Sequence, residues 1–314
     1  MTAHKEMVHK SPLELFEEKK VVRICAPMVR YSKLPFRLLV RRYGCDLTYT
    51  PMIVSESFVQ SSKARDVEFT TCNGDRPLVA QFAASNARDF ADAALIIAPF
   101  VDAVDLNCGC PQRWAMADGY GAQLMSEPEL VTDMVRQAKS RSGLPVSVKM
   151  RIHKNLKDTV EFVRRAEHAG AAWISVHGRT SKQRAEPANM DAIKLVKESV
   201  GVPVVANGDV KNEADIRRVH EHTGVNGVMS ARGILDNPAM YGGYDHTPIS
   251  CVQDWVEIAL RTGMTFTLFH HHLIFMLDRV LTRPEQRVFN TLSSVPAVLD
   301  YLEEHYGVCL YPAI

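Results

Sequence analysis

The sequence predicts a parallel (β/α)8 TIM barrel followed by a small helical domain. From about residue 20 to residue 240 one pattern repeats: a short apolar run rich in β-branched residues, a polar or glycine-containing turn, and an amphipathic stretch with helical spacing. Eight such units match the strand–helix alternation of a closed barrel. A doubly wound sheet is the main alternative, but eight evenly spaced units with polar strand ends favour closure.

The eight predicted strands are short, and polar residues or glycine follow their apolar parts. They span 21–28, 45–53, 76–82, 101–109, 145–152, 173–179, 203–210 and 226–233. Two intervening stretches, 128–143 and 156–170, read clearly as helices. The first has Pro128 at its start and both finish in glycine, as helix termini often do.

The same pattern divides the chain into three segments. Residues 1–20 are a charged N-terminal arm that we expect to be loose or helical. Residues 21–240 form the barrel and 241–314 form the helical domain, which lacks β-branched runs. The stretch 241–248 is the expected linker between these two.

Composition limits the class of protein. The 314 residues are 46% hydrophobic and 23% charged, as in ordinary globular proteins. We expect no membrane span, because no apolar run approaches about 18 residues, and no secretory leader, because the first residues are charged. Seven cysteines then indicate reduced thiols and an intracellular, cytoplasmic protein. The net charge of +1 gives no sign of a nucleic-acid partner, and we expect a monomer.

The stretch 105–112, DLNCGCPQ, places two cysteines around a glycine at the end of the fourth strand. It fits half of a metal site, a redox pair, a structural turn, or one catalytic thiol beside a bystander. A metal site needs further ligands, and the obvious candidates, His270, His271 and His272, lie in the helical domain without zinc-type spacing. We therefore predict no metal.

In a barrel of this kind the functional groups lie at the carboxyl ends of the strands. A lysine there indicates an electron-withdrawing contact to a ring or a Schiff base, and a glutamine there offers an amide to the edge of a heterocycle. The residues at the predicted ends are Pro27, Met28, Gln81, Asn107, Cys110, Lys149, Arg151, His177, Arg179, Asn207, Gly208, Asp209, Ala231, Arg232 and Gly233.

The loops after the seventh and eighth strands predict a phosphate site, a device that recurs in this fold. Gly208 and Gly233 allow backbone N–H groups to approach a phosphate, and Arg232 adds a charge-assisted contact. Together with the lysine, glutamine and histidine of neighbouring strands, these loops fit flavin mononucleotide (FMN), with its ring across the mouth.

Seven motifs, in order, resemble those of the tRNA-dihydrouridine synthases. They are CAPM, LVAQF, DLNCGCPQRWAMADGYGAQLM, VSVKMRI, VHGRT, VANGDV and SARGILDNP, across about residues 21–240. The helical tail resembles that family's recognition domain in placement and size. The segments APMVRYSKLPFR, YTPMIV, NCGCPQRWAMADGYGA and ARGILDNPAMYGGY are most similar to the eukaryotic type-4 branch. Members of that branch reduce uridines 20a and 20b of the tRNA D-loop.

The resemblance implies an activity and a role for Cys110. Reduced FMN, regenerated by NADPH or NADH, passes a hydride to C6 of a uracil turned out of the tRNA, and the Cys110 thiol protonates C5. A free thiol has an ordinary pKa of about 8.5, so it is protonated at neutral pH and suits this role. The resemblance leaves Cys108 as structural and makes the loop 111–121 a lid.

The resemblance also assigns the binding residues. The expected FMN contacts are Pro27, Met28, Val29, Gln81, Lys149 and His177. The expected phosphate contacts are Asn207, Gly208, Asp209, Ala231 and Arg232. Asn107 and Arg179 are expected to hold the uracil.

Other functions stay open at this point. A lysine in the mouth allows an aldolase that forms a Schiff base. The same barrel and flavin suit an oxidoreductase of a small pyrimidine, although such a substrate needs no helical tail. A tRNA-binding protein without activity is a third alternative, against which Cys110, Lys149 and His177 speak. Two arginine groups either contact tRNA phosphates or form solvated faces: Arg37, Arg41 and Arg42, and Arg279, Arg283 and Arg287.

Overall fold

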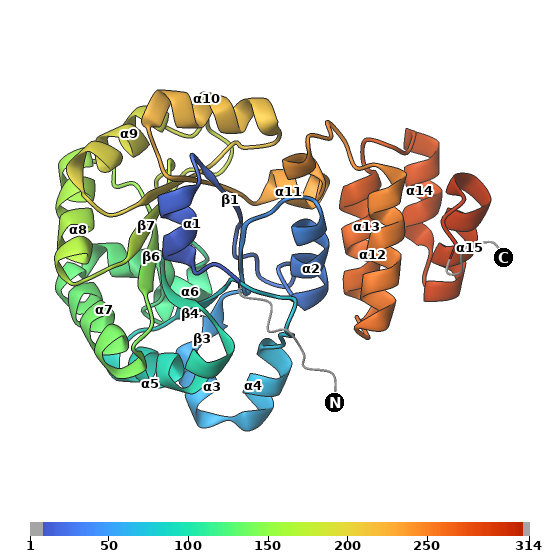
Figure 1. Ribbon diagram of the computed structural model, residues 1–314. Helices are drawn as coiled ribbons and strands as arrows, with labels where there is room; N and C mark the ends of the chain where they lie inside the picture. The colour runs from blue at the N-terminus through green and yellow to red at the C-terminus, as the bar shows by residue number, and fades with distance from the viewer. Residues whose placement is uncertain (1–8, 310–314) are drawn as a thin grey trace.

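The barrel is closed by eight parallel strands, as predicted. The computed structural model describes residues 9–309 (Figure 1). Within this range, nine strand segments make up the eight barrel strands, because the second barrel strand consists of two segments. The first segment, Val22–Cys25, pairs with the last, Gly227–Ser230, and Leu47–Tyr49 pairs with Leu78–Ala83, so that the sheet has no free edge. The strands are β1 (Val22–Cys25), β2 (Leu47–Tyr49), β3 (Ile53–Val54), β4 (Leu78–Ala83), β5 (Ala103–Cys108), β6 (Val146–Arg151), β7 (Trp173–His177), β8 (Val204–Asn207) and β9 (Gly227–Ser230).

The second barrel strand is interrupted, and this is the one departure from the predicted strand pattern. β2 pairs with the beginning of β4, and β3 pairs with its end. Between them lies Pro51, which has no N–H to offer a ladder. The hydroxyl of Thr50 accepts the hydrogen bond of the Gln81 N–H at 3.0 Å, so a side chain replaces the missing ladder partner.

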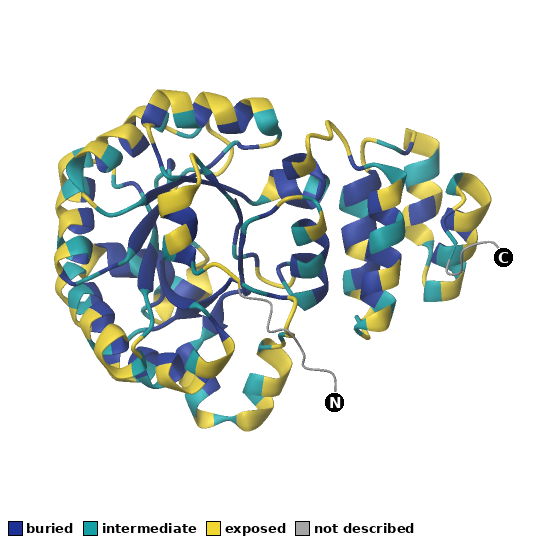
Figure 2. Cartoon of the chain, viewed as in Figure 1, coloured by how far each residue is buried: buried dark blue, intermediate teal, exposed yellow. Residues whose placement is uncertain are grey.

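Helices surround the barrel, and most of them bury one face, whereas α4 has no buried residue (Figure 2). The predicted helix ends at 128–143 and 156–170 are confirmed, since α7 ends at a left-handed Gly143 and α8 ends just before Gly170. The helices are α1 (Pro12–Glu18), α2 (Leu34–Arg42), α3 (Ser55–Gln60), α4 (Ser62–Glu68), α5 (Ala87–Ile97), α6 (Arg113–Ala117), α7 (Pro128–Ser142), α8 (Leu156–His168), α9 (Met190–Ser199), α10 (Glu213–Thr223), α11 (Arg232–Asp236), α12 (Ile249–Arg261), α13 (Phe266–Leu277), α14 (Arg283–Thr291) and α15 (Val295–Tyr306).

The N-terminal arm covers the end of the barrel opposite the functional strand ends. Residues 12–18 of the arm form α1, which begins with a capping box on Ser11, and residues 1–8 lie outside the described part. Phe16 is buried, with its ring 5.6 Å from that of Trp173 inside the barrel. The Trp173 indole N–H in turn donates to the Tyr49 hydroxyl at 2.9 Å. Aromatic side chains therefore fill this end of the barrel.

The helical tail lies beside α2 and α11 (Figure 1). α12 packs on α2, where the Trp255 and Phe36 rings are 6.4 Å apart, and the His272 ring stacks on Phe36 at 4.6 Å. His272 is fully buried, and the buried His270 ring lies 3.0 Å from the Phe289 carbonyl. Residues 9–309 contain no cluster of three or more histidine, cysteine or acidic side chains placed to hold a metal. Within the same range, no helix is both long enough and apolar enough to cross a membrane.

Arg37 and Arg41 have neither expected role, because their guanidinium groups are engaged within the protein, whereas Arg42 is exposed as expected of a solvated face. Arg37 is 1% exposed and donates to both oxygens of the buried Asp75, the shortest contact being 2.7 Å. Arg41 donates to the Thr48 hydroxyl and the Pro77 carbonyl, each at 2.6 Å. Arg42 pairs at the surface with Asp254 of α12. These arginines join α2 to its neighbours. By contrast, Arg279, Arg283 and Arg287 are exposed.

Replacing Arg37 by alanine is expected to lower the free energy of unfolding by about 3–5 kcal/mol, because the Asp75 carboxylate would stay buried without its partner. Arg42→Ala is the matched control: its ion pair is exposed and is expected to contribute about 1 kcal/mol or less. Urea unfolding of the two variants measures the difference. Equal unfolding midpoints would contradict the assignment.

Candidate functional site

The polar residues predicted at the strand ends meet at one mouth of the barrel because the strands are parallel and in register. Asn107 lies beside Lys149 on the next strand, and His177 lies beside Asn207. Two positions deeper on β5, Asp105 lies beside Gln81 of β4. The mouth therefore has two polar layers, one at the strand ends and one just below.

A chain of hydrogen bonds rises from the deeper layer to the loop after β5. The fully buried Asp105 carboxylate accepts from the Ser147 hydroxyl at 2.6 Å and from the Gln81 amide N–H at 2.8 Å. The Gln81 oxygen accepts from the Asn107 amide at 2.8 Å. The Asn107 oxygen accepts from the Cys110 backbone N–H at 2.9 Å and from that of Gly109. Asp105 is thus linked to the cysteine through two amide side chains.

The charge of Asp105 determines which group donates and which accepts in each of these hydrogen bonds. Burial raises the pKa of Asp105 to about 6, against the smaller effects of its hydrogen bonds and of the nearby Lys149 charge. At neutral pH the carboxylate form prevails, and a carboxylate only accepts hydrogen bonds. Gln81 must therefore turn its amide nitrogen toward Asp105 and its oxygen toward Asn107. Asn107 then has its own oxygen left for the loop that carries Cys110.

Cys110 is the accessible member of the cysteine pair. Cys108 is fully buried among the core side chains on the outer side of β5, and burial raises the pKa of its thiol well above the usual value. Cys110 is partly exposed and follows the strand. Its carbonyl accepts the Ala122 N–H at 2.9 Å, which closes the loop. A Cβ at Gly121 would come within 2.6 Å of that carbonyl oxygen, so only glycine fits there.

Lys149 is an unpaired cation in the mouth. Its side chain is partly exposed, and its ammonium group makes no hydrogen bond or ion pair with any residue in the range 9–309. Burial is the main cause that lowers the pKa of Lys149, to about 8, and Asp105 opposes the shift. The lysine is therefore charged at neutral pH and free to donate to a ligand.

His177 is a neutral donor. The Arg179 guanidinium lies 3.1 Å from its Nε2, and because a guanidinium only donates, Nε2 must be unprotonated. Burial, together with the charges of Lys149, Arg151 and Arg179, lowers the pKa of His177 to about 2. The proton therefore sits on Nδ1, which has no hydrogen-bond partner in the part of the chain described and is available to a ligand.

The loops after β8 and β9 form a small recess of about 70 Å³. Gly208 has a φ of +126°, and a Cβ there would lie 2.7 Å from the Ala188 Cβ. A Cβ at Gly233 would lie 2.3 Å from the Val210 carbonyl oxygen. The two glycines thus let the loops approach closely. Asn207, Gly208, Asp209, Lys211, Ala231 and Arg232 are among the lining residues.

Two predicted contacts are occupied inside the protein. The Asp209 carboxylate accepts from Arg179 at 2.6 Å and from the Ala188 N–H at 2.8 Å. Partial burial opposes ionisation, but these hydrogen bonds outweigh it and lower the pKa of Asp209. Arg179 is 2% exposed and also donates to the Glu186 carbonyl. The structure thus shows Arg179 holding His177 and Asp209 in place, and its contact with a substrate stays a prediction.

The loop after β1 reaches the rim of the mouth. Met28 is buried, its N–H donates to the Ser32 hydroxyl at 2.9 Å, and its carbonyl accepts the Ser32 N–H at 3.0 Å. Val29 is 45% exposed at the turn. Pro27, Met28 and Val29 therefore form a fixed turn at the rim, where a contact with a cofactor is geometrically open.

Sequence reasoning missed Asp105, which anchors the hydrogen-bond chain. The signal was present in the motif DLN, because positions i and i+2 of a strand face the same side and Asp105 stands two positions before Asn107. Ser147, which holds the carboxylate from β6, has the same spacing to Lys149, but its residue type gave no reason to single it out. A hydroxyl at this position resembles any other polar residue in a strand.

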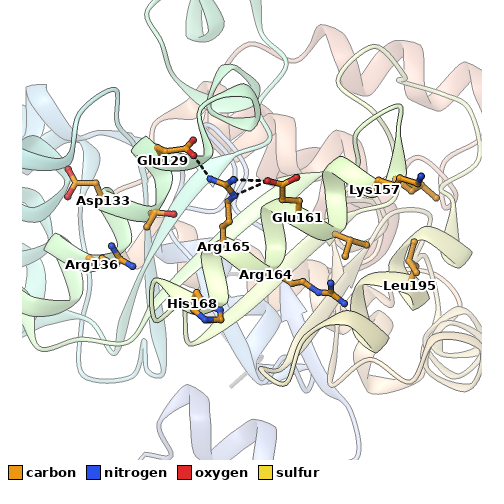
Figure 3. A pocket seen from close by; sticks show the side chains of 12 residues that line it. Glu129, Asp133, Arg136, Lys157, Glu161, Arg164, Arg165, His168 and Leu195 are labelled. Atoms are coloured by element: carbon orange, nitrogen blue, oxygen red, sulfur yellow. Dashed lines mark hydrogen bonds and ion pairs between the residues drawn. The ribbon is translucent and has the colours of Figure 1, made fainter.

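A larger hollow outside the mouth is not the candidate site. It measures about 1030 Å³ and lies on the outer side of the barrel between α7 and α8 (Figure 3). Arg165 spans it and pairs with Glu129 and Glu161, so these charges satisfy one another. The accessible thiol of Cys110 lies in the mouth instead.

Comparison with known proteins identifies the family. The model of the dihydrouridine synthase family matches residues 24–291. The chain belongs to the dihydrouridine synthase family. It is 56% identical to a mouse protein named tRNA-dihydrouridine(20a/20b) synthase [NAD(P)+]-like, over 95% of the chain and 93% of the mouse protein. A fission yeast tRNA-dihydrouridine(20a/20b) synthase [NAD(P)+] is 43% identical over 95% of the chain and 93% of its own length.

Solved structures support the fold alone. An old yellow enzyme homologue from Zymomonas mobilis aligns with a TM-score of 0.51 and 9% identity, over 70% of this chain and 86% of that one. A 2-naphthoyl-CoA reductase aligns with a TM-score of 0.54 and 8% identity, over 79% of this chain and 53% of that one. The resemblance found in the sequence motifs is therefore confirmed at the level of the family, and the barrel at the level of the fold.

Lys149→Met is expected to stabilise the protein at neutral pH. The pKa of Lys149 is about 8 in the folded protein and about 10.4 in an unfolded chain. Below pH 8 the folded protein therefore carries a charge that burial disfavours. Removing it raises the free energy of unfolding by about 1–2 kcal/mol, discounted for partial exposure.

The pH dependence distinguishes this cause from a packing effect. The gain should shrink as the pH rises from 8 to about 10.4, because the wild-type lysine loses its charge over that range. Unfolding in urea at several pH values measures it. Lys154→Met, at an exposed position in the next loop, is the control and should change stability by about 0.5 kcal/mol or less. A gain that is independent of pH would contradict the assignment.

Proposed function

We propose that this protein is a flavin-dependent tRNA-dihydrouridine synthase that reduces uridines 20a and 20b with electrons from NADPH or NADH. Its relatives in mouse and fission yeast carry this activity in their names, at 56% and 43% identity over nearly the whole chain. One arrangement in the structure carries the proposal: the accessible thiol of Cys110 follows the end of β5, next to Lys149, whose ammonium is unpaired among residues 9–309, at the mouth that also holds the neutral His177.

The donors of the mouth fit FMN. Lys149 and the Nδ1 proton of His177 have no hydrogen-bond partner among residues 9–309, and the oxygen and nitrogen atoms of a flavin ring are suitable acceptors for them. The recess after β8 and β9 fits the phosphate, with Arg232 and Lys211 as cations. The Asp209 side chain faces Arg179, so its part in phosphate binding is limited to its backbone N–H.

The turn of Pro27, Met28 and Val29 would border the ring from the β1 side. Gln81 presents an amide from below, although both ends of its side chain already have partners at Asp105 and Asn107. The bound flavin supplies the hydride that reduces the uracil at C6. Holding the substrate and donating the proton at C5 fall to residues of this chain.

Cys110 supplies the proton that the reaction needs at C5. Its thiol gives up S–H, the uracil gains C5–H, and the thiolate is reprotonated by solvent. Asn107 fixes the backbone of the cysteine, which sets the thiol position before the substrate arrives. Asn107 and Arg179 are proposed to hold the uracil as well, Asn107 through its second amide proton.

The substrate must be extruded from folded tRNA to reach the mouth. We propose that the helical tail holds the rest of the tRNA, and its exposed Arg279, Arg283 and Arg287 suit phosphate contacts. The lid role of residues 111–121, the domain boundaries at 20 and 240, an intracellular location and a monomeric state stay predictions.

Cys110→Ala is expected to bind flavin and accept electrons from NADPH at the wild-type rate, but to form dihydrouridine at least about 100-fold more slowly, since it lacks the general acid. The measurement is anaerobic: flavin bleaching by NADPH, then reoxidation by tRNA that lacks dihydrouridine, with the product mapped by nucleotide position. Cys108→Ala is the matched control and should turn over normally.

Three results would count against the proposal. Near-normal turnover by Cys110→Ala would remove the cysteine from its role. Reoxidation by a free pyrimidine and not by tRNA would make the protein a small-molecule oxidoreductase. A wild-type protein that binds tRNA but no flavin would be a binding protein.

A further inference from the structure

A second recess lies beside the mouth, between α6, the α3–α4 pair and the turn after β1. Its volume is about 560 Å³. Three of the most exposed large apolar side chains gather around it: Val29, Val67 and Trp114 are 45%, 57% and 47% exposed. Met52 and Val54 form its floor. None of these side chains belongs to the chemistry described above except Val29, which borders both the recess and the mouth.

Trp114 lines the recess and is restrained by one hydrogen bond and by the packing of its helix. Its indole N–H donates to the Gln112 amide oxygen at 2.6 Å. Its helix, α6, is fixed from below, because Ala115 and Tyr120 are buried against Met52. An aromatic ring that is already ordered loses little conformational entropy when a ligand stacks on it.

The recess is apolar and close to electrically neutral. Lys63 and Glu68 both line it, one cation and one anion, and Ser57 and Ser61 add hydroxyl groups. An aromatic face with apolar walls and a few hydroxyls suits a nucleobase. The balance of charges disfavours a ligand that brings several phosphates with it, such as the end of a nicotinamide dinucleotide.

We propose, on the basis of the function given above, that this recess binds the base of a tRNA nucleotide flanking the target uridine, stacked on Trp114. Trp114 is four residues from Cys110, at the rim of the mouth. A polynucleotide that inserts one base into the mouth must continue on both sides, so a flanking nucleotide passes over the rim. A small substrate has no such continuation. Trp114 is in this account a positioning residue for the tRNA.

The chain offers a specific optical probe for this contact. Its three tryptophans are Trp114, Trp173 and Trp255, and the last two are fully buried. The flavin-loaded enzyme is titrated with tRNA that lacks dihydrouridine, and tryptophan emission is followed. We expect saturable quenching in the wild type and its loss in Trp114→Phe, which still offers a ring for stacking.

Kinetics give an independent readout. Trp114→Ala is expected to raise the KM for tRNA on the order of tenfold, with little change in kcat or in flavin reduction by NADPH. Trp114→Phe should retain most of the wild-type KM. Phe100→Ala, which removes an equally exposed aromatic ring outside the mouth, is the matched control. Thermal unfolding of each variant checks that it is folded.

Two results would overturn the inference. One is an unchanged KM in folded Trp114→Ala, and the other is quenching by NADP+ that tRNA does not produce, which would place the dinucleotide in the recess. Failure of the proposed function looks different: the wild type itself would then form no dihydrouridine. If the wild type forms dihydrouridine and the Trp114→Ala variant has a normal KM for tRNA, only the stacking role of Trp114 is contradicted.

Discussion

A single buried carboxylate, Asp105, decides how the groups above it are oriented. It can only accept hydrogen bonds, so Gln81 turns its nitrogen toward it and its oxygen toward Asn107, and Asn107 keeps an oxygen for the Cys110 N–H. If a neutral group that both donates and accepts stood in place of Asp105, the amides of Gln81 and Asn107 could both turn over. The loop that carries Cys110 would then lose the fixed acceptor for its N–H. Burying the charge is unfavourable by itself, but the hydrogen bond from Ser147 and that from Gln81 offset part of the cost.

The electrostatics of the mouth depend on the same layer. Lys149 is attracted by Asp105 below it, which keeps the ammonium charged despite its burial. Burial, together with that charge and those of Arg151 and Arg179, in turn keeps His177 neutral. The mouth therefore offers a ligand one cation and one neutral donor, both unpaired among residues 9–309. Lys149 and His177 can therefore donate to different atoms of an electron-accepting ring. Neither takes part in the proton transfer assigned to Cys110.

The barrel was predictable because the residues that indicate each strand are neighbours in the sequence. Parts of the site were not predictable, because the residues that contact one another there are far apart in the sequence. Runs of β-branched residues mark each strand, and even the break in the second strand follows from Pro51. Asp105 could have been recognised from its spacing to Asn107 along the strand. The role of Arg37 could not: its spacing indicates a helix face, but its partner Asp75 is 38 residues away and is brought to it only by folding. The residues of the mouth were named from strand ends and motif resemblance together.

Asn107 is the link between the buried layer and the thiol, so its replacement tests the account most directly. The measurement is the single-turnover reoxidation of reduced enzyme by tRNA, in Asn107→Ala against the wild type. Asn86→Ala, which removes an amide that accepts a backbone N–H at the start of α5, is the control. We predict that Asn107→Ala keeps its flavin and its rate of reduction by NADPH but reoxidises on the order of 100-fold more slowly, while Asn86→Ala reoxidises normally. Reoxidation of Asn107→Ala within about twofold of the wild type would show that the thiol does not depend on this chain of hydrogen bonds, and would contradict the account.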